Sequence, residues 1–329
     1  MRPSPEILAE AVARLRAGRL VAFPTETVYG LGADALSDEA VARVFAAKGR
    51  PASNPLIVHV SDAAMARAMV VSRWPEEADR LARAFWPGPL SIVLPKHHRV
   101  PLRVTGGGSN VAVRCPDHPL TLSLIAEFGS PIVGPSANLS GSLSPTKAGD
   151  VRDVFSQDEV FVIDGGPCRG GIESTVLMLA DGAPAILRPG FIGAEAIEAV
   201  LGRKVSAAAG WKPVAGEAAP GPGILGRHYA PNAKAVLVDE FVAPRGMGAS
   251  AIVLVTHRPP TTPSAVRVVR MPSRAEDYAA RLYSALREAD ALSPALIVVE
   301  RPPRYGQDSA STAIWRAIHE RLERATSEG

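Results

Sequence analysis

The sequence predicts an α/β fold divided into two domains. Short apolar runs that suit buried strands alternate with segments of helical periodicity along most of the chain. Many Gly and Pro residues interrupt this alternation, which indicates long loops between the elements. The alternation stops once, in a stretch rich in Ala, Gly and Pro that starts at Ser206, and it resumes after Lys234. We therefore expect a larger and a smaller α/β domain joined by a linker.

The elements of the first domain follow from local signals. Residues 5–17 have helical periodicity, and Gly18 suits the end of that helix. Residues 20–23 (LVAF) are apolar and stop at Pro24, as a short buried strand would, and Ser37 is a suitable cap for a second helix ending near Lys48. The later segments are assigned in the same way: strands at 55–60, 91–94, 111–114, 131–133, 159–163, 174–179 and 185–187, and helices from 62 onward and at 76–85, 119–128 and 194–201.

The linker and the second domain differ clearly in composition. Residues 206–232 lack periodicity and are predicted to be extended, between a domain at 1–205 and a domain at 233–329. The second domain contains the strand-like runs AVLV, AIVLV, VRVV and ALIVV, a helix at 275–289 and a final helix after Ser309. The linker includes GPGILG (Gly221 to Gly226), but no strand precedes it, Pro222 lies inside it and no helix follows, so a dinucleotide site is not expected there.

Composition narrows the class of protein. Hydrophobic residues make up 47% of the chain and charged residues 21%, which allows a sizeable core. The net charge is only +3 without a long basic run, which argues against nucleic acid as the main partner. Cys115 and Cys168 belong to no CxxC or Cys/His cluster, so neither structural zinc nor a disulfide framework is expected. Because the N-terminus lacks the apolar core of a signal peptide and no run of ~18 apolar residues occurs, we expect a soluble, cytoplasmic protein.

Polar residues gather where the predicted strands end, which is where open α/β sheets place ligands. The cations among them are Lys48, Arg50, Arg114 and Arg188, and hydroxyls and amides accompany them in FPTETVYGLGADA, in GPSANLSGSLSPT and in GIESTVL, whereas acids are scarce. Lys48 and Arg50 can grip phosphate oxygens as a point charge and a bidentate fork. The set predicts an anion pocket for a triphosphate or a carboxylate, with any Mg²⁺ held mainly by nucleotide phosphates and water, since no paired-aspartate site is evident.

Each of these residues has a simpler explanation when taken alone. An Arg is more often the partner of a surface ion pair, and His59 sits in an apolar strand, where a core histidine is common. The serines of SANLSGSLSPT are typical turn formers and helix caps. Glu173 can pair with a nearby Arg, and Cys115 suits a buried position. It is the joint occurrence of these residues that favours a binding site.

Seven motifs in this order carry a resemblance to a known family: FPTETVYGLGADA, KGRPASNPLIVHV, WPGPLSIVL, VAVRCPDHP, GPSANLSGSLSPT, IESTVL and ILRPG. Together they closely resemble the threonylcarbamoyl-adenylate synthase family, over nearly all of residues 8–200. GRHYAP and the domain after it resemble the long, two-domain branch. The resemblance implies a YrdC-like twisted, open, mixed sheet with helices, plus a smaller Rossmann-like C-terminal α/β domain.

The activity that the resemblance implies is that of an ATP-dependent nucleotidyltransferase. L-threonine, bicarbonate and ATP, with Mg²⁺, would give threonylcarbamoyl-AMP and pyrophosphate, the first step of threonylcarbamoyladenosine modification at position 37 of certain tRNAs. A tRNA threonylcarbamoyl transferase complex would act downstream. Two other activities are compatible with the pocket: an RNA-binding module without catalysis, and a carbamoyl transferase, although the zinc-finger and acyl-phosphatase-like segments of fused carbamoyl transferases are missing.

The family's binding residues carry over to matching positions of this sequence. Arg114 would bind the threonine carboxylate, and the rest of that pocket would be Thr27, His59, Gly134 and Ser174. The nucleotide side would comprise Lys48, Arg50, Asn54, Asn110, Ser136, Asn138, Ser144, Arg188 and Tyr229. Tyr229 would reach back from the linker, which is therefore predicted to act as a lid. In the first motif, Pro24 would turn the chain into the site, and Gly30 and Gly32 would give it a tight path away.

Overall fold

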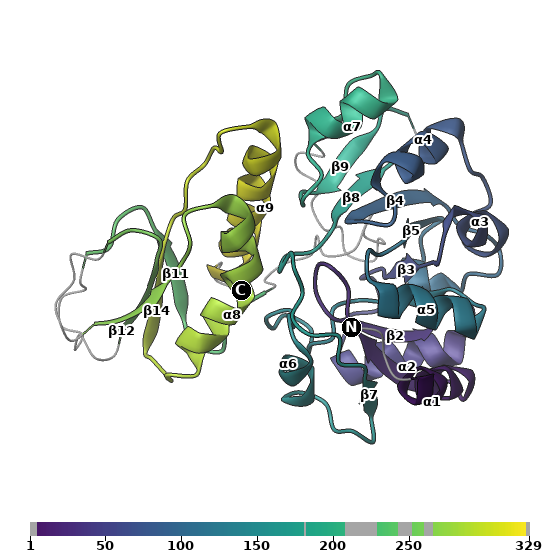
Figure 1. The fold of residues 1–329 in the computed structure, drawn as a ribbon, viewed down its shortest axis with the longest axis horizontal. Coiled ribbons are helices and arrows are strands. Elements are labelled where there is room, and N and C mark those ends of the chain that lie inside the picture. The colour runs from purple at the N-terminus through teal and green to yellow at the C-terminus, as the bar shows by residue number, and fades with distance from the viewer. Residues whose placement is uncertain (1–4, 181, 208–228, 243–251, 260–265, 327–329) are drawn as a thin grey trace.

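The structure is a computed structural model that describes residues 5–180, 182–207, 229–242, 252–259 and 266–326. Its described residues form two sheets, each with its own helices, and Figure 1 shows the two parts side by side. Most of the linker predicted at 206–232, including Gly221 to Gly226, lies outside these residues. Among the helices that are described, none has the length and apolar character needed to cross a membrane.

The larger sheet is mixed, as predicted, with the order β10-β9-β8-β4-β5-β3-β6-β2-β1-β7. The strand β3, for example, pairs in parallel with β5 and antiparallel with β6. The strands are β1 (Leu20–Phe23), β2 (Gly30–Asp34), β3 (Ile57–His59), β4 (Leu90–Pro95), β5 (Asn110–Arg114), β6 (Ile132–Val133), β7 (Val160–Val162), β8 (Thr175–Met178), β9 (Ala185–Arg188) and β10 (Ser206–Ala207).

Helices of the larger part pack around this sheet, and their ends follow ordinary capping chemistry. The Ser37 side chain accepts a hydrogen bond from the Ala40 amide at the start of α2, and Gly49 ends that helix with a φ of 57°. The helices are α1 (Pro5–Arg16), α2 (Asp38–Lys48), α3 (Ala63–Met65) continued by the π-helical turn η1 (Ala66–Val70), α4 (Glu76–Phe85), the 3₁₀ turn η2 (Leu102–Thr105), α5 (Pro119–Phe128), α6 (Ala148–Arg152) and α7 (Ala194–Leu201).

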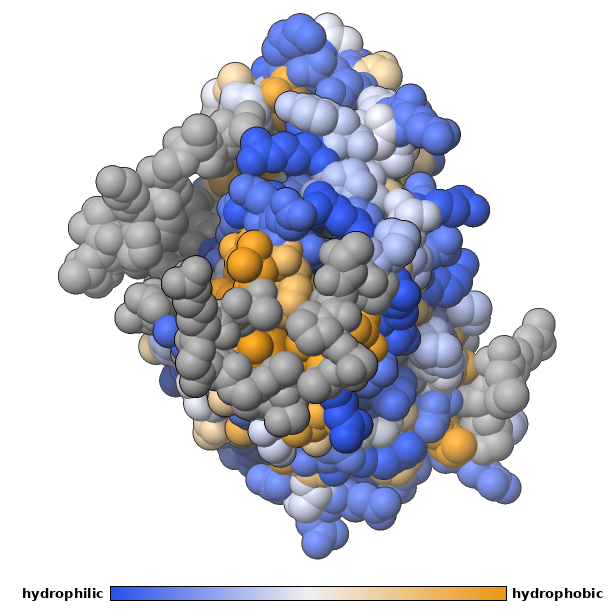
Figure 2. All heavy atoms as spheres, turned by 90° about the vertical axis from the view of Figure 1, so that its left-hand side faces the viewer, coloured by the Kyte–Doolittle hydropathy of each residue, from blue (hydrophilic) through white to orange (hydrophobic). Residues whose placement is uncertain are grey.

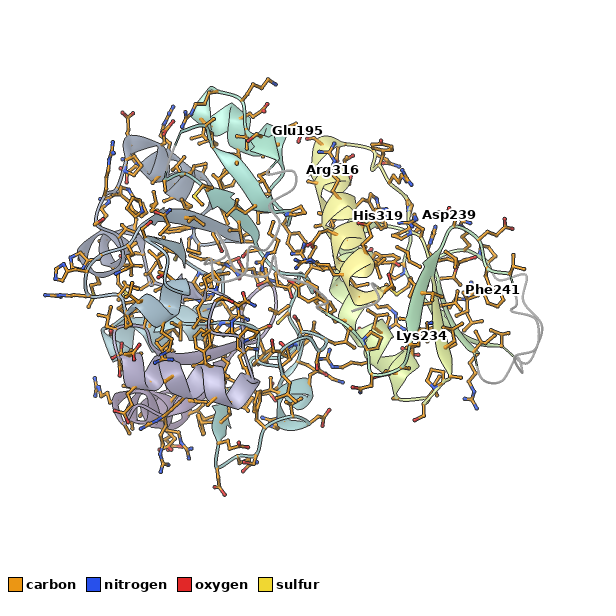
Figure 3. All side chains as sticks on the ribbon, turned by 180° about the vertical axis from the view of Figure 1, so that it is seen from behind. Glu195, Lys234, Asp239, Phe241, Arg316 and His319 are labelled. Atoms are coloured by element: carbon orange, nitrogen blue, oxygen red, sulfur yellow. The ribbon has the colours of Figure 1, made fainter. Side chains whose placement is uncertain are left out.

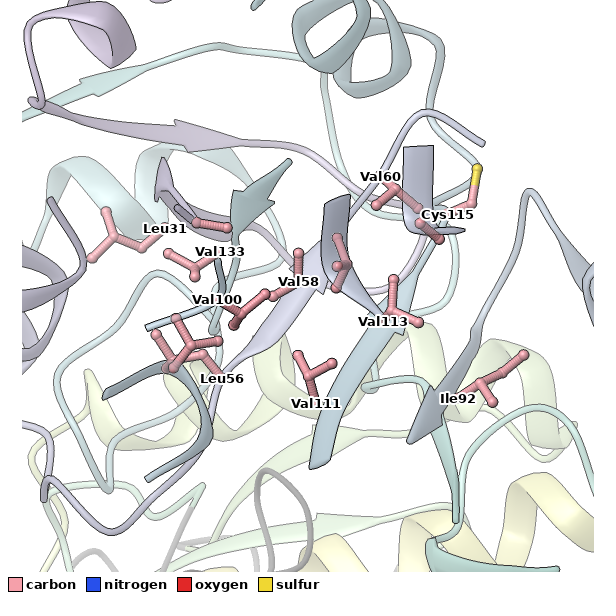
Figure 4. Packing of buried hydrophobic residues seen from close by; sticks show 14 of the residues in the cluster. Leu31, Leu56, Val58, Val60, Ile92, Val100, Val111, Val113, Cys115 and Val133 are labelled. Atoms are coloured by element: carbon pink, nitrogen blue, oxygen red, sulfur yellow. The ribbon is translucent and has the colours of Figure 1, made fainter. Parts of the chain in front are cut away.

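The core of this part lies between the central strands and the helices. Figure 4 shows small β-branched side chains from neighbouring strands meeting one another, among them Val58, Val113 and Val133, all with no exposed surface. Residues of this type suit a sheet that is covered on its faces, because they pack well against a pleated surface. The core thus fixes the central strands whose ends carry the polar residues of interest.

Three features differ from the sequence prediction. The glycines of GLGAD lie in strand β2, not in a tight loop. Glycine is needed at both positions because a Cβ at Gly30 or Gly32 would come within 2.6 or 3.0 Å of the Phe23 ring on the paired strand β1. The short helix α6 was not predicted. Ser206 and Ala207, the first residues of the predicted linker, form β10 and pair in parallel with β9.

The smaller part is an α/β domain with a four-stranded parallel sheet ordered β11-β14-β12-β13. Its elements are β11 (Ala235–Val238), β12 (Ile252–Thr256), β13 (Arg267–Arg270), α8 (Ala275–Asp290), β14 (Leu296–Glu300) and α9 (Ser309–Thr326). Both helices lie on the face of this sheet that is turned toward the larger part (Figure 1). On the outer face, Figure 2 shows apolar side chains gathered within a mostly hydrophilic surface, in agreement with a small apolar cluster that includes Leu254, Val298 and Phe241.

Candidate functional site

A pocket lies where several strands of the large sheet end. It is lined by residues of the β1–β2 loop, β2, the α2–β3 loop, β3, β5, the segment after β6, the loop before β8, β9 and the end of the linker: Thr25, Thr27, Val28, Gly30, Arg50, Pro55, Leu56, Ile57, His59, Arg114, Gly134, Pro135, Ser136, Glu173, Ser174, Arg188 and Tyr229.

One wall of the pocket is built around Arg114, a buried cation at the end of β5. Its guanidinium donates to the Gly88 carbonyl at 3.1 Å and to Thr27 Oγ1 at 3.1 Å, and it forms an ion pair with Glu26 at 2.7 Å. Nε and Nη1 each donate one hydrogen bond, whereas Nη2 meets Glu26 as an ion pair without hydrogen-bond geometry, so N–H groups on both terminal nitrogens remain for a ligand. Arg114 can therefore bind a carboxylate while Glu26 holds it from behind.

Two threonines set the hydrogen-bonding direction on this wall. Thr25 Oγ1 donates its proton to the Val28 carbonyl at 2.6 Å, so the 2.8 Å contact between the two hydroxyls takes its proton from Thr27. Thr27 Oγ1 then presents its lone pairs to Arg114. Because this chain of bonds is buried, its direction is fixed before any ligand arrives.

His59 and Gly134 form the neighbouring wall at very close range. The His59 ring packs edge-on against Phe23 with centroids 5.4 Å apart, and its Nδ1 is buried without a hydrogen-bond partner among the described residues. Burial, followed by the nearby charge of Arg114, lowers the pKa of His59 well below 6.5. The imidazole is therefore neutral and can accept or donate one hydrogen bond at the pocket.

We expect Gly134→Ala to distort this wall. A Cβ on residue 134 would lie 2.6 Å from His59 Nδ1 and 2.7 Å from Phe23 Cζ, so the two rings must move. Such overpacking costs about 1–3 kcal/mol of unfolding free energy, and it should also weaken amino-acid binding. Chemical denaturation and calorimetric titration with threonine measure both effects. Gly149→Ala in α6 is the control, because its Cβ would meet only Lys147 Cε at 3.9 Å, and unchanged threonine binding in Gly134→Ala would contradict the assignment.

The neutral state of His59 predicts a pH dependence of stability. The pKa of His59 is depressed on folding and returns to about 6.5 in the unfolded chain. Between the two values the unfolded state binds more protons than the folded state. The free energy of unfolding therefore decreases as the pH falls below about 6.5. We expect the unfolding free energy of the wild type to decrease more steeply from pH 7 to pH 5 than that of His59→Gln. Urea denaturation across this range tests the expectation, and parallel curves would refute it.

Arg50 brings another cation to the pocket lining. Arg50, in the loop after α2, donates to the Asn54 carbonyl at 3.0 Å, to Asn54 Oδ1 at 2.8 Å and to the Pro55 carbonyl at 2.8 Å. Burial, partly offset by Tyr229, lowers the pKa of Arg50 to about 10, so it stays charged at neutral pH. Asn54 thus orients the guanidinium, which itself lines the pocket.

Lys48 is the last residue of α2 and is not among the residues that line the pocket. Its Nζ donates to the carbonyls of Ser136 and Asn138, both at 2.5 Å, and the residue is only 2% exposed. Burial and then the charge of Arg50 lower the pKa of Lys48 well below 10.5. In this arrangement Lys48 holds the loop that presents Ser136 to the pocket.

Ser174 and Arg188 close the pocket on the side of β8 and β9. Ser174 Oγ lies 2.9 Å from Ser91 Oγ, and the Arg188 guanidinium donates to the Ser174 carbonyl at 2.9 and 3.2 Å. Both residues are buried. Arg188 therefore adds a further cation to the pocket lining, and its charge helps to lower the pKa of Arg50.

The structure places the predicted residues in two groups. All those predicted for threonine line the pocket, as do Arg50, Ser136, Arg188 and Tyr229. Of the others, Lys48, Asn54 and Ser144 act on lining residues through hydrogen bonds, and the Asn138 amide donates to the Leu139 and Ser142 carbonyls. Asn110 starts β5 opposite Pro95 and does not line the pocket.

Sequence reasoning missed the role of several residues. Glu26 lies between Thr25 and Thr27 and pairs with Arg114. An acid among the residues of a predicted anion pocket could have indicated that it pairs with a cation. Glu173 was expected to pair with some Arg, but its partner proves to be Arg321 in the second domain, at 3.0 Å. Tyr283, also in the second domain, donates to the same carboxylate. Nothing in the local pattern around Tyr283 or Arg321 pointed to the pocket.

The pocket offers little to a metal ion. Within the described ranges, no three His, Cys, Asp or Glu side chains come together as metal ligands would. Among the lining residues that the structure describes, Glu173 is the one carboxylate, and Arg321 and Tyr283 already bind it.

Comparison with protein families gives two matches that together span most of the chain. The Sua5/YciO/YrdC family model, described as telomere recombination, matches residues 13–190. A second model, described as the C-terminal domain of threonylcarbamoyl-AMP synthase, matches residues 192–327.

Relatives and solved structures agree with these matches. The chain is 41% identical to threonylcarbamoyl-AMP synthase of Bacillus subtilis over 97% of its own length and 92% of the relative's. It is 49% identical to the Pyrococcus abyssi protein of that name over 68% of its own length and 66% of the relative's. The crystal structure of P. abyssi Sua5 complexed with L-threonine superimposes with a TM-score of 0.84 at 38% identity, covering 98% of this chain and 94% of that one. Escherichia coli YciO, at 23% identity and a TM-score of 0.52, shares the fold of 57% of this chain.

Proposed function

Because this chain belongs to the Sua5/YciO/YrdC family and also carries the C-terminal domain of its two-domain members, we propose that it is a threonylcarbamoyl-AMP synthase. It joins L-threonine, bicarbonate and ATP into threonylcarbamoyl-AMP and releases pyrophosphate, as a nucleotidyltransferase in tRNA modification. The alternative of an RNA-binding module without catalysis is not favoured, because the relatives are named for this enzymatic activity.

The observation that carries the proposal is a pocket lined by two chemically different groups of residues. Arg114, Thr27 and the neutral His59 suit the carboxylate, hydroxyl and amine of an amino acid. Arg50 and Arg188 suit phosphate oxygens. Both groups line one pocket, so an amino acid and a nucleotide can meet there.

The reaction follows from this arrangement. The threonine amine combines with bicarbonate to give a carbamate and water, and a carbamate oxygen then attacks the α-phosphorus of ATP. The new oxygen–phosphorus bond forms as the bond to the pyrophosphate oxygen breaks. Arg114 fixes the amino acid, and Arg50 and Arg188 neutralise charge on the phosphates, so catalysis rests on positioning and electrostatics and needs no covalent nucleophile. Mg²⁺ would neutralise further phosphate charge; we propose that it is bound by the ATP oxygens and water.

The remaining parts of the chain have supporting roles in this proposal. We assign the catalytic domain to residues 1–205 together with the β10 residues Ser206 and Ala207, a lid to the rest of the linker predicted at 206–232 and a C-terminal domain to 233–329. Tyr229, which lines the pocket, supports the assignment of the lid. The substrates place the activity in the cytoplasm, and the product would pass to a tRNA threonylcarbamoyl transferase complex.

The proposed activity is tested by measuring pyrophosphate release from ATP. We expect release only when both threonine and bicarbonate are present, and mass spectrometry should detect threonylcarbamoyl-AMP. Serine, which lacks the methyl group, and alanine, which lacks the hydroxyl, serve as matched controls for the amino acid. Release that continues without threonine, or none under any condition, would refute the proposal.

A further inference from the structure

Glu173 is the point where the second domain meets the pocket. It lies in the loop before β8, lines the pocket and is 7% exposed. Its carboxylate accepts hydrogen bonds from Ser144 Oγ at 2.6 Å, from the Tyr283 hydroxyl at 3.0 Å and from Arg321 Nε at 3.0 Å. Tyr283 is on α8 and Arg321 is on α9, so both helices of the second domain reach one side chain of the pocket wall.

The charge of Glu173 would oppose an anionic ligand if nothing balanced it. Burial alone raises the pKa of this carboxyl, but Arg321, Arg188 and the Ser144 hydroxyl together hold it at about 2, so it is ionised at neutral pH. A triphosphate in the same pocket would be repelled by a lone carboxylate. Arg321, which is 1% exposed and therefore poorly screened by water, cancels that charge.

The same two residues also hold the aromatic ring at the end of the linker. The rings of Tyr229 and Tyr283 stack with centroids 5.7 Å apart, and the Arg321 guanidinium lies 5.6 Å from the centre of the Tyr229 ring. Tyr229 has a φ of 63°, a left-handed conformation that is costly for a tyrosine and persists where contacts hold it. Arg321 and Tyr283 thus contact an acid and an aromatic ring that both line the pocket.

The loops before Ser144 and Glu173 pack directly against helix α8. Gly171 has a φ of 77°, and a Cβ there would lie 2.3 Å from the Ala279 carbonyl oxygen, so only glycine permits this approach. Arg287 of α8 donates to the carbonyls of Leu143 at 2.6 Å and Ser144 at 2.9 Å. The position of Glu173 relative to α8 and α9 is therefore closely defined.

We propose that Arg321 and Tyr283 are positioning residues for nucleotide binding: they hold and neutralise Glu173 so that a triphosphate can enter, and they hold Tyr229 beside it. The second domain is then part of the nucleotide site. The inference rests on the proposed function, because it takes the anionic ligand of the pocket to be ATP.

Equilibrium binding of ATP and of threonine to the full chain tests the proposal by calorimetry. Arg321→Met should weaken ATP binding at least about tenfold at pH 8 and change threonine binding by less than about threefold, because it removes the ion-pair partner of Glu173. Glu173→Gln combined with Arg321→Met removes both charges and should recover most of the ATP affinity. Arg316→Met is the matched control, since Arg316 is an exposed arginine on the same helix (Figure 3).

A measurement against pH adds a readout that a purely structural role would not change. Without Arg321 the pKa of Glu173 must rise, so the ATP deficit of Arg321→Met relative to the wild type should shrink as the pH is lowered from 8 toward that raised pKa. If that variant does not fold, Tyr283→Phe tests the same carboxylate while it keeps the ring on Tyr229, and it should weaken ATP binding alone.

The outcomes separate the two proposals. Equal losses for ATP and threonine, no recovery in the double variant, or a deficit that does not depend on pH would overturn the role of Arg321 and leave the synthase proposal intact. Unchanged ATP binding in Arg321→Met, or in Tyr283→Phe where that replaces it, would do the same. A wild-type protein that binds no ATP would overturn both.

Discussion

Replacing Arg114 by Ala should raise the Michaelis constant for threonine by about 100-fold, because it removes the buried cation that we assign to the substrate carboxylate. The Michaelis constant for ATP should change by less than about threefold, since we assign the phosphates to Arg50 and Arg188. Steady-state pyrophosphate release with each substrate varied in turn measures both constants. Equal changes in the two would contradict the assignment.

The same substitution should also destabilise the fold. Glu26 would be left in a buried position without its 2.7 Å ion-pair partner, and removing one partner of such a pair costs about 3–5 kcal/mol of unfolding free energy. The exposed ion pair of Arg169 and Asp117, which is 2.6 Å long, is the matched control, and Arg169→Ala should change stability by less than about 1 kcal/mol.

A double variant separates the loss of binding from the loss of stability. Glu26→Gln with Arg114→Met leaves no lone buried charge, so it should be more stable than Arg114→Ala in urea denaturation. It should still fail to bind threonine, because no cation remains for the carboxylate. Threonine binding restored along with stability would show that Arg114 has only a structural role.

The sequence predicted local structure well where the signal was local. The helices α4, α5 and α7 begin and end at the residues expected from periodicity and flanking Pro or Gly. Strand β2 was missed because GLGAD has the composition of a turn, and its glycines are needed for a reason that lies in another strand, the Phe23 ring of β1. A requirement imposed by a neighbouring strand cannot be recognised from the sequence of the segment alone.

The candidate site shows the same limit on a larger scale. The motifs that carry the family resemblance identified the lining residues Thr27, Arg114 and Ser174 by type and position. The partners that orient such groups come from elsewhere: Arg321 meets Glu173 across 148 residues, and nothing near either residue specifies the other. Sequence reasoning therefore finds groups that contact a ligand more readily than groups that position them.

Lys48 illustrates how such a positioning group can be tested. Its buried Nζ donates hydrogen bonds to the carbonyls of Ser136 and Asn138, and Lys48→Met would remove this donor from both. The Ser136 carbonyl would keep the Asn138 amide as a donor, but an unpaired Asn138 carbonyl costs about 1–3 kcal/mol, and the loop would be free to move Ser136 away from the proposed phosphate site. We expect turnover to fall by about 100-fold or more, with weakened ATP binding.

The comparison that decides the role of Lys48 is between the two ligands. Threonine binding in Lys48→Met should change by less than about threefold, because the wall around Arg114 draws its contacts from Gly88, Thr27 and Glu26. Lys96→Met is the matched control, since Lys96 Nζ also donates to a backbone carbonyl, that of Val100 at 3.1 Å, and Lys96 does not line the pocket. Calorimetric titrations of ATP and of threonine into both variants measure the difference. An equal loss for both ligands in Lys48→Met would mean that the lysine supports the whole pocket, whereas a loss for ATP alone places its effect on the loop of Ser136.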